Sequence, residues 1–327
     1  MSKLIHLDSA AAERRIRPYV RETPLWRSRW LSERTGANVF LKLENMQETG
    51  AFKLRGAANK LLSLSPAQAA AGVVTASSGN HALATATMGR KLGIATEVFV
   101  CEHIHPRRLA AIQSLGIHVQ QVAGDPLAAE QAARNLAELS GREYVSPYND
   151  ERVIEGQGTI AVEILRQLPE AAASICPLDA IFVAVGGGGL IGGIGAHLQR
   201  ESAATQTVGC WPENAPALEA CLRAGRIVEV DEKPTVSTST AGGIEPGAVT
   251  FPIAQQVIAR TLRVSEEEIL QSLRQLYVED EWVVEGAAGV ALAGLLQRAE
   301  EYVGRNVVVL ICGGNADPDL EEQIKAR

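Results

Sequence analysis

The sequence is poor in aromatic residues and in cysteine. Aromatic residues make up only 4% of the 327 residues, which disfavours a surface that binds nucleic acid by base stacking. The cysteines are odd in number, scattered, and without the spacing of metal ligands: Cys101, Cys176, Cys210, Cys221 and Cys312. This usage is typical of a reduced intracellular protein with free thiols, so we expect a cytoplasmic location.

Long apolar runs and an excess of positive charge are also absent. No stretch of about 18 uncharged apolar residues occurs, and the first twenty residues lack the apolar run of a signal peptide. The formal net charge is −7, from 31 basic and 38 acidic residues, which argues against nucleic acid and anionic membranes. We therefore expect neither nucleic acid nor a membrane among the partners.

The sequence does contain a regular alternation of strands and helices. Strands are predicted at residues 37–43, 72–75, 95–100, 118–122, 180–185, 207–211 and 306–312. Helices are predicted at residues 8–20, 30–35, 52–64, 81–92, 106–115, 126–140, 158–168, 215–224, 265–279 and 286–303, and a Gly-rich helix is predicted directly behind the glycine run that follows residue 185. This order predicts an α/β fold with open, mainly parallel, twisted sheets flanked by helices. A chain of 327 residues exceeds one typical core, so we expect two domains.

Lys53 is the first candidate for a reactive group. It lies between Phe52 and Leu54 in the segment GAFKLRGAAN. Partial desolvation by apolar neighbours would lower the pKa of its amine and favour the neutral form that attacks carbonyl groups. Taken alone, a surface lysine with its stem along apolar residues is the commoner explanation. The assignment therefore depends on motifs further along the chain.

Three such motifs follow predicted strands. They are SSGNH at residues 77–81, GGGGL at residues 186–190 and CGGN at residues 312–315. The first two also precede predicted helices, whose unpaired N–H groups attract phosphate or carboxylate groups. In open α/β sheets, ligands bind beyond the carboxyl ends of the strands, where all three motifs would meet. Each motif alone could be a tight turn, a helix cap or a core cysteine.

In this order, the lysine motif and these three motifs resemble the pyridoxal 5'-phosphate (PLP) enzymes of fold type II. The resemblance is strongest to the branch of serine/threonine dehydratases (threonine ammonia-lyases) and serine racemase, and it runs from Thr23 to the final GGN. It implies a two-domain fold like that of the tryptophan synthase β chain. The large, PLP-binding domain would comprise residues 1–71 and 150–327, and the small domain residues 72–149. It also implies a homodimer.

The resemblance assigns a role to each motif. Lys53 would hold PLP covalently and remove the Cα proton of the substrate, with Ser78 as a second catalytic residue. The other cofactor-binding residues would be the phosphate loop, a ring-stacking residue, and the partners of the ring hydroxyl and the pyridine nitrogen: Gly186, Gly187, Gly188, Gly189, Leu190, Phe52, Asn80 and Cys312. The substrate carboxylate would be bound by Ser77, Ser78, Gly79, Asn80 and His81.

The activity that the resemblance implies is a PLP-dependent lyase. It would convert a small L-3-hydroxy amino acid, L-threonine or L-serine, by β-elimination to a 2-oxo acid and ammonia. The residue types agree with this chemistry, because a neutral Cys312 thiol would not keep the pyridine nitrogen protonated. A long-lived carbanion is then disfavoured, and prompt loss of the β-hydroxyl is favoured.

Two departures from the family pattern affect metal and substrate. Trp211 and Ala217 stand where this branch carries acidic ligands of a divalent cation, so we expect no divalent metal ion. Gly242-Gly243 replaces a common Ala-Asp-Gly in a loop that approaches the cofactor. A bulkier 3-hydroxy amino acid, such as phenylserine or a hydroxyectoine-derived compound, is therefore an alternative substrate.

Other activities remain open from sequence alone. Ser78 occupies the position of the opposite-face acid/base of serine racemase, so racemisation is one alternative. A β-replacement synthase is disfavoured, because its usual motif has threonine where this chain has His81. A non-catalytic PLP-fold binding protein is disfavoured by the presence of Lys53, Asn80 and the glycine loop.

Overall fold

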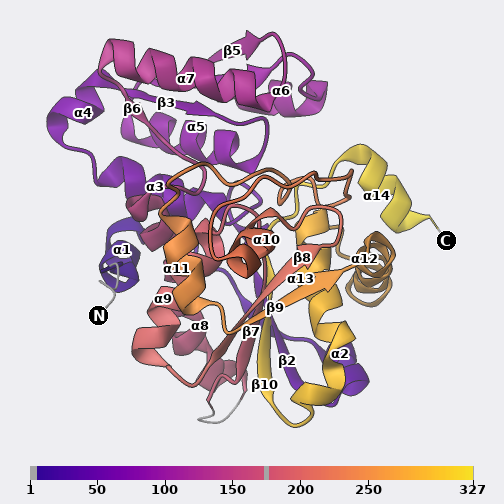
Figure 1. Cartoon of the computed structure of the whole chain (residues 1–327). Coiled ribbons are helices and arrows are strands. Elements are labelled where there is room, and N and C mark those ends of the chain that lie inside the picture. Colours follow the sequence, from indigo (N-terminus) through magenta and orange to yellow (C-terminus); the bar gives the residue numbers. More distant parts are fainter. Residues whose placement is uncertain (1–5, 173–176, 327) are drawn as a thin grey trace.

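The computed structural model describes residues 6–172 and 177–326, in two groups of elements that each surround a sheet (Figure 1). Cys176 lies outside the described residues. The other cysteines, Cys101, Cys210, Cys221 and Cys312, are free thiols.

The larger sheet has six strands in the order β1-β2-β10-β7-β8-β9. Their bounds are β1 Leu25–Arg27, β2 Asn38–Leu43, β7 Ala180–Ala184, β8 Gln206–Pro212, β9 Arg260–Val264 and β10 Asn306–Ile311. Only the edge pair β1 and β2 is antiparallel, and the other pairs are parallel. The central strand β7 is apolar throughout and β10 is apolar after its first residue, Asn306, because helices cover both faces of the sheet.

Helices pack on both faces of this six-stranded sheet, so the larger part has three layers. Figure 1 shows α8 (Glu151–Ala171) and α9 (Gly189–Glu201) on one face, and α2 (Arg29–Thr35), α12 (Glu266–Asp280) and α13 (Gly286–Gln297) on the other. The remaining helices of this part lie around its edges: α1 Ser9–Ile16, α10 Ala217–Ala224, α11 Thr250–Val257 and α14 Pro318–Lys325. Short 3-10 helices occur at Glu44–Met46 and Ala299–Tyr302.

The smaller sheet has four parallel strands in the order β5-β4-β3-β6. They are β3 Val73–Ala76, β4 Thr96–Cys101, β5 His118–Val122 and β6 Glu143–Tyr144. Side chains alternate across the sheet, as the pleat requires. Phe99 packs toward α7 (Pro126–Ser140), whereas Val98 and Val100 pack in a cluster with residues of α5 (Asn80–Leu92) and α6 (Pro106–Gln113).

Helix α3 (Lys53–Leu62) joins the two parts. Its buried Leu54 and Leu61 belong to the same apolar cluster as Val73 of β3 and Met88 of α5. It also packs against α8 of the large part. The chain leaves α3 through α4 (Pro66–Ala71) and enters β3 directly. The residue bounds 72–149 for a small domain stay a prediction, because α3 shares a core with both parts.

The predicted fold class is confirmed, and the differences concern short or capped elements. The short elements β1, β6, β9, α4, α11 and α14 were not expected from the sequence. Helix α8 begins at Glu151 rather than near residue 158, because the Asp150 side chain accepts hydrogen bonds from the main-chain N–H groups of Arg152 and Val153.

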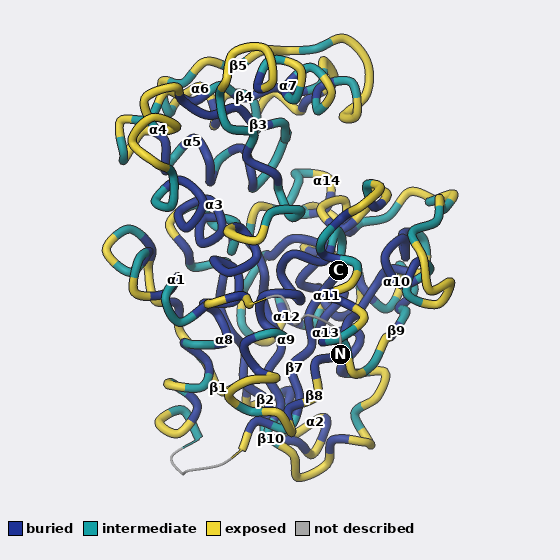
Figure 2. The backbone as a smooth tube through the Cα atoms, turned by 60° about the vertical axis from the view of Figure 1, so that its left-hand side comes forward, coloured by how far each residue is buried: buried dark blue, intermediate teal, exposed yellow. Residues whose placement is uncertain are grey.

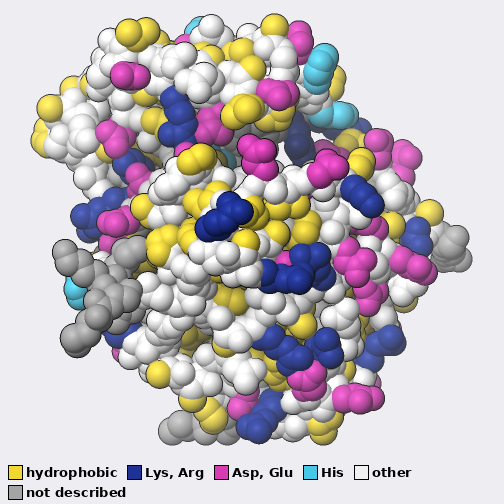
Figure 3. All heavy atoms as spheres, in the orientation of Figure 1, with side chains coloured by type: hydrophobic (Ala, Val, Ile, Leu, Met, Phe, Trp, Pro, Cys, Tyr) yellow, Lys and Arg dark blue, Asp and Glu magenta, His cyan; other side chains and the backbone are white. Residues whose placement is uncertain are grey.

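The buried residues are concentrated in the sheets and in the helix faces that pack on them. Figure 2 shows buried residues through the large sheet and the helices packed on it, and exposed residues around the periphery of both parts. Acidic and basic side chains are interspersed over the face seen in Figure 3. No helix in the described part of the chain is long and apolar enough to span a membrane.

Candidate active site

One cavity of about 590 Å³ lies at the carboxyl ends of strands from both sheets. Lys53 follows the loop after β2, and the other three motifs directly follow β3, β7 and β10. The structure brings every predicted site residue to the wall of this cavity: Phe52, Lys53, Ser77, Ser78, Gly79, Asn80, His81, Gly186, Gly187, Gly188, Gly189, Leu190 and Cys312. Residues far apart in the sequence therefore converge at the edge where parallel strands end.

The segment before Lys53 is hydrogen-bonded to the end of β10. The Phe52 main-chain N–H donates to the Cys312 carbonyl at 3.0 Å, and the Gly314 N–H donates to the Gly50 carbonyl at 2.8 Å. The lysine and the CGGN motif are thus held in one register by main-chain bonds. Substituting side chains alone would not separate them.

A buried ion network fixes the start of α3 from the other side. Arg55 lies fully buried and pairs with Glu44 at 2.8 Å and with Glu163 of α8 at 2.7 Å. Lys42 of β2 also binds Glu163, at 2.7 Å. Burial opposes ionisation of Glu163, but Arg55 and Lys42 outweigh it and bring the pKa of this carboxyl down to about 2. The network ties α3, β2 and α8 together two residues beyond Lys53.

The Lys53 amine donates a hydrogen bond to the Pro147 carbonyl at 2.6 Å. Burial lowers the pKa of Lys53 to about 8, although the negative charge of Glu285 opposes this change. With that pKa, about one amine in ten is neutral at pH 7. A lysine of ordinary pKa would supply far less of the neutral form that attacks a carbonyl.

The glycine loop forms the beginning of α9 on the cavity wall. Its N-cap, Gly188, has a φ of +87°, and no side chain caps the helix. A Cβ atom at Gly187 would lie 2.4 Å from the ring of Tyr148, so the main chain here packs directly against that ring. The helix N-terminus therefore leaves its N–H groups without a side-chain partner, as an anion site requires.

A second helix N-terminus without a side-chain cap faces the same cavity. Gly79 is the N-cap of α5, and the Ser77 hydroxyl accepts a hydrogen bond from the Gly79 N–H at 3.2 Å. The Ser78 hydroxyl lies 3.7 Å from the Cys101 sulfur, and the two groups share one weak hydrogen bond. The α5 terminus therefore provides a second place for an anion, separate from the glycine loop.

The ring of His81 has a structural partner. Its Nε2 lies 2.9 Å from the Val145 carbonyl, which can only accept, so Nε2 carries the hydrogen. Burial, together with the charge of Lys53, lowers the pKa of His81 to about 3, which keeps the imidazole neutral. The ring then has no second N–H to offer, and the donor that His81 can give to an anion is its main-chain N–H in the first turn of α5.

Sequence reasoning missed Glu285, the N-cap residue of α13. Its buried carboxylate lines the cavity and accepts hydrogen bonds from Asn80 Nδ2 at 2.7 Å and from Cys312 Sγ at 3.3 Å. Burial raises the pKa of Glu285, while these two hydrogen bonds and Lys53 act in the opposite direction. The available signal was an isolated acidic residue in VVEGAAG, directly before an apolar helix.

These groups fit PLP. The α9 terminus suits its phosphate, and the Lys53 amine suits its aldehyde. Phe52 supplies an apolar wall beside the amine, and Asn80 and Cys312 supply polar groups for the ring substituents. Burial raises the pKa of the Cys312 thiol well above its usual value, and Glu285 raises it further, so the thiol is neutral.

The two residues at the positions of the family's divalent-cation ligands, Trp211 and Ala217, have no oxygen atom in their side chains. Trp211 is fully buried at the end of β8, and Ala217 is buried at the start of α10. Neither side chain can bind a hard cation. Within residues 6–172 and 177–326, no cluster of three or more His, Cys, Asp or Glu residues could hold a metal ion.

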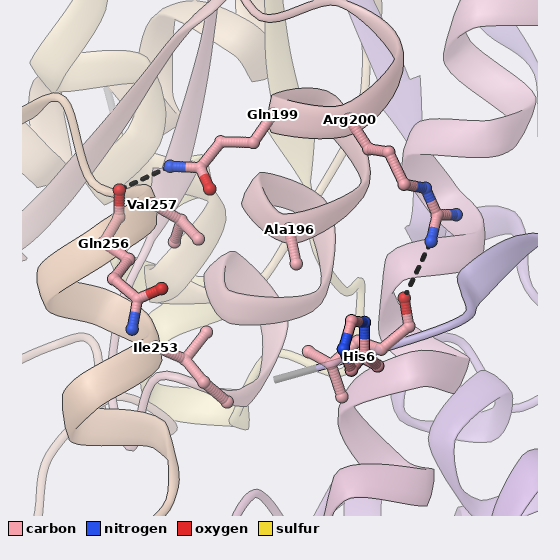
Figure 4. Close-up of a pocket in the computed structure, with 8 residues that line it drawn as sticks. His6, Ala196, Gln199, Arg200, Ile253, Gln256 and Val257 are labelled. Atoms are coloured by element: carbon pink, nitrogen blue, oxygen red, sulfur yellow. Dashed lines mark hydrogen bonds between the residues drawn. The ribbon is translucent and has the colours of Figure 1, made fainter. Parts of the chain in front are cut away.

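A second cavity, of about 560 Å³, lies between α9, α11 and the segment before α1 (Figure 4). Its floor is apolar, with Ile253, Val257 and Ala196, and its rim carries Gln199 and Arg200. Arg200 is already bonded to the Leu7 carbonyl at 3.3 Å. None of the predicted site residues lines this cavity.

Comparison with known proteins finds similarity to PLP-dependent enzymes, in agreement with a site that fits PLP. The family model described as "Pyridoxal-phosphate dependent enzyme" matches residues 16–313. An L-threonine ammonia-lyase of Thermotoga maritima is 35% identical over 317 residues, covering 97% of this chain and 77% of that relative. A beta-hydroxyaspartate dehydratase of Paracoccus denitrificans is 33% identical, covering 95% and 96%. The structure of maize serine racemase superposes with a TM-score of 0.89 at 27% identity, covering 96% and 94%.

Proposed function

The chain belongs to the family of pyridoxal-phosphate dependent enzymes, and on this basis we propose that it is a lyase acting on a small L-3-hydroxy amino acid. The substrate would be L-threonine or L-serine, and the products a 2-oxo acid and ammonia. A relative at 35% identity carries the name L-threonine ammonia-lyase, and others carry dehydratase names.

The observation that carries the proposal is the arrangement around Lys53. An amine with its pKa lowered to about 8 shares one cavity with two helix N-termini that lack side-chain caps. One terminus would bind the cofactor phosphate and the other the substrate carboxylate. A PLP enzyme that acts on an α-amino acid needs these two anion sites beside its lysine.

The chain would bind PLP through Lys53, the loop from Gly186 to Leu190, Asn80, Cys312 and Phe52. When bound, PLP supplies the electron sink that makes the Cα proton of an amino acid acidic. The protein then orients the substrate by its carboxylate at the start of α5, and the Lys53 amine removes the Cα proton. The β-hydroxyl would leave as water with the proton taken from Cα, and the electron pair of the broken Cα–H bond would form the Cα–Cβ double bond. Water would then hydrolyse the released enamine to the 2-oxo acid and ammonia.

A neutral thiol at Cys312 supports elimination over slower fates of the substrate. Because the thiol stays protonated, it cannot stabilise a positive charge beside it as a carboxylate would. Negative charge at Cα is then best relieved by immediate departure of the β-hydroxyl. The same preference for elimination holds for L-threonine, for L-serine and for the bulkier 3-hydroxy amino acids.

The proposal is tested with a panel of 3-hydroxy amino acids. The purified enzyme is incubated with L-threonine, L-serine, 3-hydroxyaspartate and phenylserine, and 2-oxo acid formation is measured. We expect turnover of at least one L-isomer by the wild type and none by Lys53→Ala. Borohydride treatment should attach PLP to Lys53, and a label found on Lys42 or Lys60 would contradict the assignment.

Racemisation is the second candidate function, because the superposed maize enzyme is a serine racemase and Ser78 lies on the cavity wall. In a lyase, Ser78 would only help to seat the carboxylate or return a proton. Ser78→Ala should then abolish any D-amino acid formation and retain 2-oxo acid formation. Loss of one hydrogen bond to a charged group predicts a decrease of about ten- to a hundred-fold in rate. Wild-type interconversion of L- and D-serine faster than 2-oxo acid release would instead identify a racemase.

We further propose a homodimer in the cytoplasm, with domain bounds at residues 72–149 for the small domain. The family resemblance supports the dimer, and the reduced cysteines support the compartment. Size-exclusion chromatography with light scattering tests the dimer, and a mass near 34.8 kDa at assay concentration would contradict it.

A further inference from the structure

We propose that Glu285 is a positioning residue that fixes the orientation of the Asn80 amide and thereby strengthens PLP binding. The inference rests on the proposed cofactor site, in which Asn80 binds the ring hydroxyl. In this role Glu285 contacts neither substrate nor cofactor and acts only through Asn80.

A main-chain carbonyl determines which end of the Asn315 amide is the nitrogen. Asn315 Nδ2 lies 2.9 Å from the carbonyl oxygen of Thr49. A carbonyl oxygen can only accept, so the Asn315 atom at that position must be its amide nitrogen. The same nitrogen lies 2.7 Å from the Asn80 side chain, whose contacting atom must therefore be the oxygen Oδ1.

The Asn80 orientation then determines what Glu285 does. With Oδ1 toward Asn315, the Asn80 nitrogen Nδ2 lies 2.7 Å from Glu285 Oε2 and donates to it. The opposite orientation would leave Asn80 Oδ1 against a carboxylate oxygen and its Nδ2 against the amide nitrogen of Asn315, which are two repulsive contacts. Glu285 and Asn315 therefore select the same orientation from opposite sides.

Glu285 is itself held tightly. Its other oxygen accepts from the Cys312 thiol at 3.3 Å, and its main-chain N–H donates to the Gly313 carbonyl at 3.1 Å. A Cβ atom at Gly313 would lie 2.7 to 2.9 Å from the carboxylate atoms, so the carboxylate packs directly on the glycine. The carboxylate cannot move toward β10, and it keeps its position against Asn80.

The consequence is one oriented donor on the cavity wall. The Asn80 amide nitrogen has two hydrogens, and within the described residues only the one given to Glu285 has a partner. The second hydrogen is available to an acceptor in the cavity, such as the phenolic oxygen of PLP. Asn80 comes from α5 of the small sheet, whereas Glu285 and Asn315 belong to the large part. The network therefore presets this donor without requiring the ligand to order it.

The experiment measures the PLP dissociation constant of the apoenzyme by absorbance or fluorescence titration. Glu285→Ala should weaken PLP binding by about ten- to a hundred-fold, the effect of losing a hydrogen bond to a charged group. Gly313→Ala keeps the carboxylate but displaces it, and it should weaken binding in the same direction. Gly314→Ala is the matched control in the same loop. The nearest atoms to its new Cβ belong to Asn45, at 3.2 to 3.8 Å, and not to the Glu285 carboxylate.

A double-mutant cycle distinguishes action through Asn80 from a general effect on the fold. If Glu285 acts through Asn80, Asn80→Ala combined with Glu285→Ala should bind PLP as Asn80→Ala alone does. Additive losses, or a Glu285→Ala variant with wild-type affinity, would overturn the inference. If Glu285→Ala does not fold, Asn315→Ala removes the opposite constraint, and the same cycle is run with it. A wild-type apoenzyme that does not bind PLP would refute the proposed function itself.

Discussion

At the scale of single residues, the properties of Lys53 follow from its surroundings. The same side chain on the surface would have a pKa near 10.5, and burial lowers it to about 8. The neutral amine is the form that reacts with the PLP aldehyde, so the rate of PLP incorporation into the apoenzyme should rise with pH and level off above about 8. Stopped-flow absorbance at several pH values measures this rate. A midpoint near 10.5 would show that the amine is not desolvated in solution.

The buried network beside Lys53 predicts a large effect on stability. Arg55→Met would leave Glu44 and Glu163 without their main partner, because both carboxylates bind this guanidinium. Removal of one member of a buried ion network costs about 3–5 kcal/mol of unfolding free energy. Urea unfolding of the apoenzyme measures the loss. The control is Arg29→Met, which breaks an exposed pair with Glu33 and should leave the stability almost unchanged.

Sequence reasoning identified the residues that lie in motifs and missed those that act from outside them. Lys53, Asn80, Cys312 and the glycine loop are found because turns and helix starts constrain their neighbours. Glu285 has only a weak signal, a single acidic residue before an apolar helix, because its place in the site depends on the loop after β10, where the Gly313 carbonyl accepts from its main-chain N–H. The tautomer of His81 likewise depends on Val145, 64 positions away, and a sequence does not reveal that contact.

At the scale of elements, the beginning of α9 depends on Gly188. Its φ of +87° favours glycine, and a Cβ atom there would lie 2.8 Å from Leu218. Gly188→Ala should lower the free energy of unfolding by about 1–2 kcal/mol and weaken binding of both PLP and inorganic phosphate. Thermal unfolding and ligand titration measure the two effects. The control is Gly304→Ala, which has a similar positive φ of +73° and no atom within 4 Å of the new Cβ; it should lower stability by backbone strain alone and leave both ligands bound as in the wild type. An equal loss of binding in both variants would contradict this role of Gly188.

The elements that sequence reasoning predicted are those with a strong local pattern. Long helices such as α7 and apolar strands such as β7 are recognisable from periodicity and capping residues. Strand β9, with sequence RTLRV, carries two arginines and forms a strand because it pairs with β8 along the edge of the sheet. Helices α4, α11 and α14 have only six to eight residues each, so their periodicity is weak, although the equally short α2 and α10 were predicted.

At the scale of the whole molecule, the cavity is built by both sheets, so cofactor binding should stabilise both. Saturating PLP at about a hundred times its dissociation constant adds about 2.7 kcal/mol to the unfolding free energy. We expect the holoenzyme to unfold in one transition at a higher temperature than the apoenzyme, as measured by calorimetry. Lys53→Ala, which cannot retain PLP covalently, should show a smaller increase. A shift confined to one of two separate transitions would indicate that the parts unfold independently.

The position of β10 has a consequence for how the protein is made. This strand pairs with β2 on one side and β7 on the other, although about 260 residues separate β2 from β10 in the chain. At about 5–20 residues per second, a ribosome needs about 13 to 50 s to make that stretch. The last strand of the smaller sheet ends at Tyr144, so this sheet can form early. Strand β2 has no β10 to pair with until the end of the chain is made. During this interval, the nascent chain already contains Lys53 and the SSGNH motif, whereas strand β10 and the CGGN motif, which complete the site, have not yet been translated.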